Sequence, residues 1–485
     1  MQAFARQASA ETAVDRLSEL YEGSVAGLRA ALERFAGAGA VPDARLRESG
    51  AFVYPELRVI YGPHGRAPKV DRAFARFNQP GVYAVTITRP DLFRSYLLEQ
   101  LGPLIAEYGA EVEVGPSTQD IPYPYVLDGA DLPLGTLTSL ELSRHFPTTH
   151  LAHIGDELAD GRWDPTSSPH LPLALFDALR TDFSLARLRH YTGTPPEHFQ
   201  SYVLFTNYHR YVDEFVRFAL ARLDESDAYR GLSCSGGPII TRGTANADAA
   251  VADSAWRRHQ MPAYHLVHES GRGISLVNIG VGPSNAKTIT DHLAVLRPEA
   301  WLMIGHCGGL RPTQTIGDYV LAHAYLRDDK ILNEVLPPEI PLPAIAEIQQ
   351  ALHQAAVLVT GESGEPLKRR MRTGTVVTTA DRNWELLFTQ SALRFNQSRA
   401  VAIDMESGTI AAQGYRFRVP YGTLLCVSDK PLHGELKLPG MANRFYERAI
   451  SEHIRIGIAA IDELKRAGSA LHSRKLRSFD EPPFR

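Results

Sequence analysis

Two carboxylate side chains follow predicted strands in the C-terminal part of the chain. Glu406 comes soon after the short apolar run 401–403, and Asp429 comes just after the longer apolar run 421–427. Ligands of open α/β sheets bind beyond the carboxyl ends of the strands, so we expect both carboxylates to face one crevice. Such a pair of carboxyl groups could take part in general acid–base chemistry. The alternative is that Glu406 only begins a helix and Asp429 only caps the next loop.

Glycine-containing loops precede this pair of carboxylates. The buried strand pattern 274–279 is followed by the turn 280–285 and then by a helical pattern that reaches residue 296. Glycines at such a junction let backbone amides approach an anion at the start of the helix, although many such turns only tighten the connection. A second glycine loop contains Gly237 and is followed by Arg242, whose guanidinium group is a candidate anion ligand.

Composition and charge exclude several classes of protein. Hydrophobic residues make up 44% and charged residues 22% of the 485 positions, as in ordinary globular domains. The formal net charge of −4 argues against general affinity for nucleic acid or for anionic membranes. No stretch approaches about 18 apolar residues and no signal peptide is evident, so we expect a cytoplasmic protein without membrane association. The polar, net basic tail after Arg466 is predicted to be a surface arm.

Neither the cysteines nor the histidines match a known metal motif. The three cysteines are far apart, which predicts buried free thiols in a reducing compartment: Cys234, Cys307 and Cys426. Histidines and aspartates crowd the irregular, Pro- and Gly-rich region 115–175, at positions His150, His153, His170, Asp156, Asp160 and Asp164. A metal site and a solvated interdomain loop are the two interpretations of this region, and we predict no metal.

The pattern of helices and strands predicts two domains. Residues 1–175 contain an amphipathic helical pattern at 12–37 and strand patterns at 51–61 and 81–88, so we expect a smaller N-terminal α+β domain, with a regulatory role as one hypothesis. Residues 176–485 alternate strands and helices, with loops at the strand ends. This alternation predicts a three-layer α/β/α catalytic domain with a mixed, mostly parallel sheet.

The order of five motifs in the second half of the chain resembles the purine nucleoside phosphorylase and nucleosidase superfamily. In sequence order the motifs are SLVNIGVGPSNA, IGHCGG with IGD downstream, VVTTADRNW, DMES and VSD. The exact residues of these motifs are most similar to those of bacterial AMP nucleosidases. The large N-terminal region and the string FTNYHRYVDEF resemble the same proteins. This similarity covers nearly the whole chain and implies a nucleoside phosphorylase-like catalytic domain.

The resemblance also implies roles for individual residues. Met405 would lie under the ribose, and Glu406 would hold the ribose hydroxyl groups. Asp429 would face N7 of the purine and donate a proton to it, with Ser428 in support. The other substrate contacts predicted in this way are Gly305, His306, Asp381, Trp384, Gly237 and Arg242, the last two as guesses for the 5′-phosphate.

One departure from the superfamily pattern bears on the nucleophile. Phosphorylases of the superfamily tend to hold inorganic phosphate with an Arg and a Ser or Thr near this strand end, where Met303 and His306 stand in this chain. A thioether does not bind an anion, so water is favoured over phosphate. The expected reaction is hydrolysis of the N-glycosidic bond of AMP to adenine and ribose 5-phosphate, through an oxocarbenium-like transition state. The alternatives are a phosphate-dependent purine nucleoside phosphorylase and a nucleotide-binding regulator without turnover.

The resemblance finally implies a molecular context. It points to a homo-oligomer, specifically a homohexamer, that acts in AMP metabolism and purine salvage. The chemistry would need no cofactor. Mg-ATP would act as an allosteric activator, and inorganic phosphate would act as a second regulator.

Overall fold

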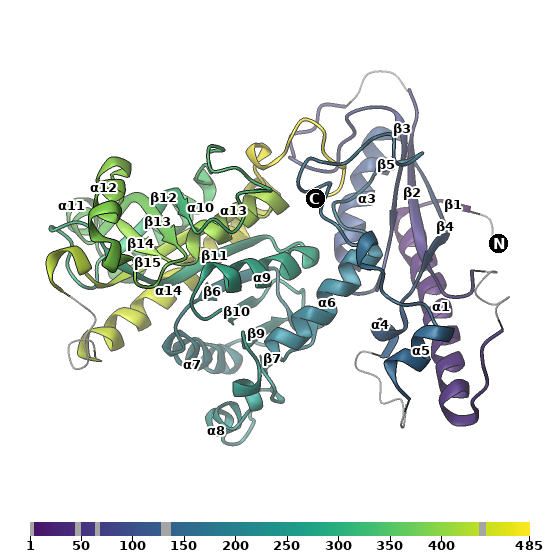
Figure 1. The fold of residues 1–485 in the computed structure, drawn as a ribbon, viewed down its shortest axis with the longest axis horizontal. Helices are drawn as coiled ribbons and strands as arrows, with labels where there is room; N and C mark the ends of the chain where they lie inside the picture. Colours follow the sequence, from purple (N-terminus) through teal and green to yellow (C-terminus); the bar gives the residue numbers. More distant parts are fainter. Residues whose placement is uncertain (1–3, 44–49, 64–67, 128–136, 436–442) are drawn as a thin grey trace. The chain divides into compact units, whose positions relative to one another are not determined.

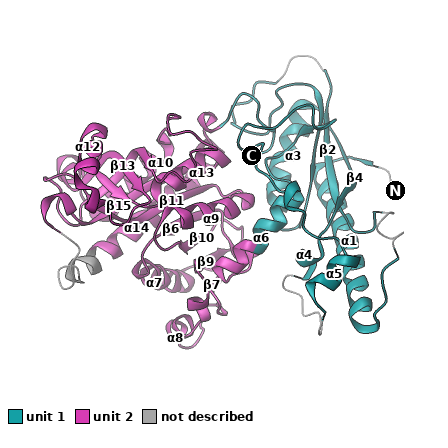
Figure 2. Ribbon diagram, in the orientation of Figure 1, with its two compact units in different colours: residues 1–186, 477–485 teal, residues 187–476 magenta. Residues whose placement is uncertain are grey.

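Two compact units make up the chain. The computed structural model describes residues 4–43, 50–63, 68–127, 137–435 and 443–485. One unit consists of residues 1–186 and 477–485, and the other consists of residues 187–476 (Figure 2). The chain therefore leaves the first unit at residue 186 and returns to it for its last nine residues.

The first unit is built on a five-stranded sheet with the strand order β1-β4-β2-β3-β5 (Figure 1). Strand β2 pairs antiparallel with β3 and β4, and β5 joins β3 in the parallel sense. The strand patterns at 51–61 and 81–88 are confirmed as β2 and β3. The elements of this unit are β1 (Ala5–Gln7), α1 (Ala10–Ala38), β2 (Val53–Tyr61), β3 (Gly81–Thr86), α3 (Arg94–Tyr108), β4 (Glu111–Asp120), α4 (Tyr123–Leu127), α5 (Ser139–His145), β5 (Leu171–Pro172) and the first half of α6 (Ala178–Thr192).

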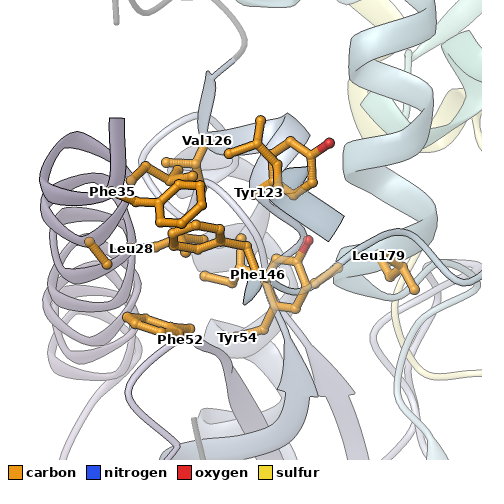
Figure 3. Close-up of a cluster of buried hydrophobic side chains, with 13 residues drawn as sticks. Leu28, Phe35, Phe52, Tyr54, Tyr123, Val126, Phe146 and Leu179 are labelled. Carbon is orange, nitrogen blue, oxygen red and sulfur yellow. The ribbon is translucent and has the colours of Figure 1, made fainter. Parts of the chain in front are cut away.

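Helix α1 carries the predicted apolar stripe. Ser9 begins the helix with a capping box, because its hydroxyl accepts from the Thr12 N–H while the Thr12 hydroxyl accepts from the Ser9 N–H. Gly39 ends it in the left-handed conformation, with φ 64°. A cluster of buried side chains joins α1 to the neighbouring elements of the unit (Figure 3) and includes Leu28, Phe35, Phe52, Tyr54, Tyr123, Val126, Phe146 and Leu179.

The C-terminal tail is not the surface arm that its composition predicted. The Phe484 side chain is 1% exposed, and the Phe484 N–H donates to the carbonyl of Leu173 at 3.1 Å. The Arg485 N–H donates to Gln100 Oε1 at 2.7 Å. A polar stretch can therefore be held in the first unit by one buried ring and by backbone hydrogen bonds, neither of which a composition reveals.

Part of the region 115–175, predicted to be irregular, is regular. Strand β4 continues through Pro116 to its end at Asp120, and α4 follows almost at once. Pro116 lies opposite Pro55 of β2, where the register of the two strands shifts. Neither proline has an N–H to donate, so both are tolerated at this irregular point of the ladder.

The second unit contains a ten-stranded mixed sheet with the order β14-β13-β12-β15-β11-β6-β10-β9-β7-β8. Strands β10, β6, β11 and β15 run parallel to their neighbours in this series. Strand β14 also pairs antiparallel with the end of β11, so β11, β15, β12, β13 and β14 close into a ring of strands. The carboxyl ends of the parallel strands consequently meet beside the end of β14.

Helices cover both faces of this sheet. On β11, Trp301 lies against Gly414 of α13, where an added methyl group would be 2.8 Å from the indole nitrogen. Ile304 lies against Gly457 of α14, where a methyl group would be 3.0 Å from the isoleucine side chain. Trp301 and Ile304 are three positions apart on β11, so their side chains point to opposite faces of the sheet. Helices α13 and α14 therefore cover opposite faces, and the predicted three-layer α/β/α arrangement is confirmed.

The bounds of the second unit's elements agree with most of the predicted ones. They are β6 (Tyr202–Thr206), α7 (Arg210–Glu225), β7 (Tyr229–Cys234), β8 (Ile239–Ile240), α8 (Ala247–Ala252), β9 (Ala263–His268), β10 (Ile274–Asn278), α9 (Pro283–Leu293), β11 (Ala300–Gly309), β12 (Tyr319–Asp328), α10 (Ala346–Thr360), α11 (Gly364–Arg370), β13 (Met371–Thr379), α12 (Phe388–Ser398), β14 (Ala402–Asp404), α13 (Ser407–Phe417), β15 (Tyr421–Asp429) and α14 (Asn443–Ala467). Among the described helices of the whole chain, none combines the length and the apolar character needed to cross a bilayer.

Candidate active site

Glu406 lies at the junction of β14 and α13, with its carboxyl group out of contact with solvent. Its relative exposure is 0%, and both of its oxygens accept hydrogen bonds. Oε1 accepts from the Gly282 N–H at 2.6 Å, and Oε2 accepts from the Asn207 side-chain amide at 2.8 Å. A buried carboxyl group needs such partners, because an unpaired one would bear the full cost of desolvation.

Two parallel strands bring these donors to Glu406. Strand β6 ends just before Asn207, and the adjacent β10 leads into the turn that contains Gly282. Gly282 has φ 119° and ψ 152°, a region essentially restricted to glycine. The predicted glycine turn therefore does present a backbone N–H, and its acceptor is a carboxyl oxygen of the protein itself.

Asp404 is a second buried carboxyl group behind Glu406. Its oxygens accept from the Thr378 hydroxyl at 2.7 Å and from the Ser407 N–H at 2.8 Å, which ties β14 to β13 and to the start of α13. Burial raises the pKa of Glu406 above its ordinary value, and the neighbouring Asp404 raises it further. Burial raises the pKa of Asp404 as well. The two groups therefore titrate as an interacting pair.

Asp429 stands at the end of β15, on the other side of β11 from β14. Gly308 of β11 pairs with Ile403 of β14 on one side and with Asp429 on the other. The Ser428 hydroxyl lies 2.6 Å from Asp429 Oδ1, within donating distance. The end of β11 is thus flanked by Asp429 and by the strand that leads to Glu406, and the expectation that the two carboxylates face one crevice stays a prediction.

The His306 ring, close to Asn207, packs against two tyrosine rings. Its ring centroid lies 5.2 Å from that of Tyr208 and 5.3 Å from that of Tyr211. The Tyr211 hydroxyl is 2.7 Å from Nδ1 of His453, whose Nε2 is 2.9 Å from the carbonyl oxygen of Leu424. Burial lowers the pKa of His453 to about 3, so the imidazole is neutral, donates through Nε2 and accepts from the tyrosine.

The predicted base-flanking residues occupy two different environments. Trp384 is 8% exposed and packs edge-on against Phe395 at 5.2 Å, in a cluster that includes Ile403 of β14. Asp381 is exposed, and its Oδ1 accepts from the Asn383 N–H at 2.9 Å. Trp384 therefore contributes to the hydrophobic support of β14, and the contact of either residue with a base stays a prediction.

The structure does not bring the predicted phosphate ligands to Glu406. Arg242 follows the edge strand β8, where its Nε donates to the carbonyl of Leu223 at 2.7 Å and its Nη1 pairs with Asp227. Gly237 packs against Ser254, since a methyl group there would lie 2.7 Å from the serine Cβ. The glycine at 237 serves close packing of its loop, and the Arg242 guanidinium group is engaged by the connection between α7 and β7.

Sequence reasoning missed Asn207, and it predicted the glycine turn without predicting that Glu406 accepts from Gly282. Asn207 lies 199 positions before Glu406, and Gly282 lies 124 positions before it. The available signal was positional, because Asn207 directly follows the buried run 202–206 at the carboxyl end of a strand. In the described part of the chain, His, Cys, Asp and Glu side chains form no group of three or more that could hold a metal ion.

Comparisons with known proteins found similar families and structures. A family model described as "Bacterial AMP nucleoside phosphorylase N-terminus" matches residues 12–170, and one described as "Phosphorylase superfamily" matches residues 249–462. The crystal structure of AMP nucleosidase from Bacteroides thetaiotaomicron VPI-5482 is similar at 27% identity over 59% of this chain and 97% of that chain, with a TM-score of 0.42. Uridine phosphorylase from Thermococcus kodakarensis is 23% identical over 154 residues, which cover 30% of this chain and 55% of that protein.

The curated relatives include one of much higher identity. AMP nucleosidase from Escherichia coli (strain K12) is 64% identical over 474 residues, which cover 98% of each chain. A shared sequence of that extent includes both units. This chain belongs to the AMP nucleosidase family.

Proposed function

We propose that this protein hydrolyses the N-glycosidic bond of AMP, releasing adenine and ribose 5-phosphate. The observation that carries the proposal is the 64% identity to an AMP nucleosidase over 98% of both chains. The geometry is consistent with it, because a buried, doubly hydrogen-bonded carboxyl group and a second carboxyl group flank the end of one strand. Glycoside hydrolysis likewise uses a carboxylic acid to protonate the leaving group.

In the proposed mechanism the two carboxyl groups act on opposite parts of the substrate. Asp429, hydrogen-bonded to Ser428, protonates N7 so that adenine leaves as a neutral base, a contribution of about 10²–10⁴-fold. Glu406 holds the ribose hydroxyl groups and faces the positive charge that develops on the sugar. Met405, between Asp404 and Glu406, supports the ribose, and Gly305 and His306 line the substrate site.

Water is the nucleophile in this proposal. A hydrolase needs no pocket for inorganic phosphate, and the position next to Gly305 supports this, since Met303 is fully buried and its methyl group approaches that glycine. His306 packs against the rings of Tyr208 and Tyr211. An oxocarbenium ion is strongly electrophilic, so a weakly activated water suffices.

The remaining parts of the proposal concern the assembly and its control. We propose a cytoplasmic homohexamer in purine salvage that needs no cofactor for its chemistry. Mg-ATP would activate it and inorganic phosphate would regulate it, with the first unit as the candidate regulatory domain. Affinity for nucleic acid or membranes is not expected at a net charge of −4.

Product analysis tests the central proposal. Purified protein is incubated with AMP, with and without inorganic phosphate, and the products are identified by NMR. Adenine and ribose 5-phosphate formed without phosphate are the expected result. Turnover only in the presence of phosphate, with a ribose 1-phosphate product, would establish the phosphorylase instead. AMP binding without turnover, even after addition of ATP, would favour a nucleotide-binding regulator.

A further inference from the structure

Asn207 connects two strand ends of the site to Glu406. It follows β6, and its Nδ2 donates to Glu406 Oε2 at 2.8 Å. Its Oδ1 accepts from the backbone N–H of His306 on β11 at 3.3 Å. Gly305 makes this approach possible, because a methyl group there would lie 2.7 Å from Asn207 Oδ1. Both ends of the amide are therefore engaged by fixed parts of the site.

The chemistry of its partners fixes the orientation of this amide. A backbone N–H can only donate, so the carbonyl oxygen of Asn207 must face His306. The amide NH₂ group is then turned toward Glu406, which must accept. Gly282 N–H donates to the other carboxyl oxygen at 2.6 Å. An ionised carboxylate accepts on both oxygens, whereas a protonated acid has only one good acceptor oxygen.

We propose that Asn207 is a positioning residue that fixes the rotation of the Glu406 side chain and favours its ionised form. The inference rests on the proposed hydrolysis of AMP, in which Glu406 grips the ribose hydroxyl groups. Asn207 lies in the string FTNYHRYVDEF, but the sequence assigns it no role. Its function would be to offset the burial of Glu406 and the nearby Asp404, which both favour the protonated acid.

The other titratable groups around Glu406 come from three elements. Asp404 ends β14, two residues before Glu406, and acts on Glu406 through its charge. His306 and Cys307 lie on β11, and burial raises the pKa of the Cys307 thiol so that it carries no charge at neutral pH. Asp429 ends β15 on the far side of Cys307. Asn207 and Gly282 donate to the two Glu406 carboxyl oxygens, and a backbone hydrogen bond from Met405 also favours the ionised form.

Two substitutions separate the effect of Asn207 on the charge of Glu406 from its effect on the position of the Glu406 side chain. Asn207→Ala removes both hydrogen bonds. Asn207→Asp is nearly isosteric and keeps an acceptor for the His306 N–H, but it replaces the donor with a carboxyl group that faces Glu406. Loss of a hydrogen bond to a charged group should lower kcat/KM for AMP at neutral pH about 10- to 100-fold in Asn207→Ala. The acidic limb of its pH profile should move to higher pH by about one unit.

Asn207→Asp should shift that limb further in the same direction, because like charges then compete for one proton. The basic limb should stay in place in both variants. The control is Asn78→Ala, which removes an amide that donates to the carbonyls of Phe479 and Glu481 in the first unit. The control should leave the pH profile unchanged. Melting temperatures verify that all variants are folded.

The outcomes distinguish this inference from the proposed function. Wild-type protein that releases no adenine from AMP refutes the function on which the inference rests. Active wild-type protein with an unmoved acidic limb in the folded Asn207→Asp variant refutes the inference alone. A merely structural role would lower the melting temperature and the amount of active enzyme without moving the limb, and this result would also overturn the proposal.

Discussion

Gly282 allows a direct test of how the turn between β10 and α9 supports the site. An alanine methyl group at this position would meet no atom within 4 Å, so crowding contributes nothing to the effect of Gly282→Ala. The backbone conformation alone matters, with φ 119° and ψ 152°. Holding a residue other than glycine in this region costs about 1–3 kcal/mol. The folded protein can relieve that strain only by rotating the peptide unit away from this conformation.

That rotation would move the Gly282 N–H away from Glu406 Oε1, from which it is now 2.6 Å distant. A hydrogen bond to a charged group contributes about 1.5–3 kcal/mol. If the bond orients Glu406 for the transition state, its loss should lower kcat/KM for AMP about 10- to 150-fold. Adenine release measured at initial rates, together with the melting temperature, gives both quantities for the variant.

Gly271→Ala is the matched control for this substitution. Gly271 also has a positive φ, 72°, and also has open space around its Cα, but it lies in the turn between β9 and β10 and its N–H donates to His268. Both variants should lose stability, and only Gly282→Ala should lose most of its activity. Equal activity losses in the two variants would refute the argument that the Gly282 N–H supports Glu406.

Three further predictions concern other parts of the chain. Asp429→Asn should still bind AMP in calorimetry but lose about 10²–10⁴-fold in kcat, because an amide cannot supply the proton; near-normal turnover would remove Asp429 from the acid role. Burial raises the pKa of Asp182 in the first unit from 3.8 to about 6. The folded state therefore holds this proton where the unfolded chain has lost it, and the free energy of unfolding should fall by about 2 kcal/mol between pH 4 and pH 6. Urea denaturation should find a smaller fall in Asp182→Asn, and an equal fall would assign the effect elsewhere. Phe484→Ala should destabilise the first unit by about 3 kcal/mol in the same assay, whereas an unchanged midpoint would mean that the tail contributes no stability.

The strands of the second unit could be predicted from the sequence because they are buried on both faces. The run 421–427 is almost continuously apolar and became the body of β15, whose last residue is the predicted Asp429. The glycine turn after β10 was equally clear. These signals are local, since each depends on residues that are adjacent in the chain.

The partners of Glu406 and the place of the tail could not be predicted in this way. Asn207 and Gly282 meet Glu406 only because β6, β10 and β14 converge, and no local pattern encodes that convergence. Phe484 is one aromatic residue in a polar tail, and its burial depends on a partner such as Leu173 more than 300 positions away. Trp384 is the opposite case, because a motif predicted a role for it without showing its packing. The motif indicated a ligand contact, and in the structure the side chain also packs against Phe395 in the core.

The opposing influences on Glu406 fit the reaction that we propose. Burial and Asp404 make its negative charge costly in the free enzyme, while two hydrogen bonds keep the group oriented. In the proposed transition state the ribose gains positive charge beside this carboxylate, and their attraction is strong because solvent is excluded. The attraction is weaker with neutral ribose in the ground state. The ionised form of Glu406 therefore has an unfavourable free energy before the reaction and is stabilised during it. This change lowers the free energy of the transition state relative to bound AMP, and that difference raises kcat.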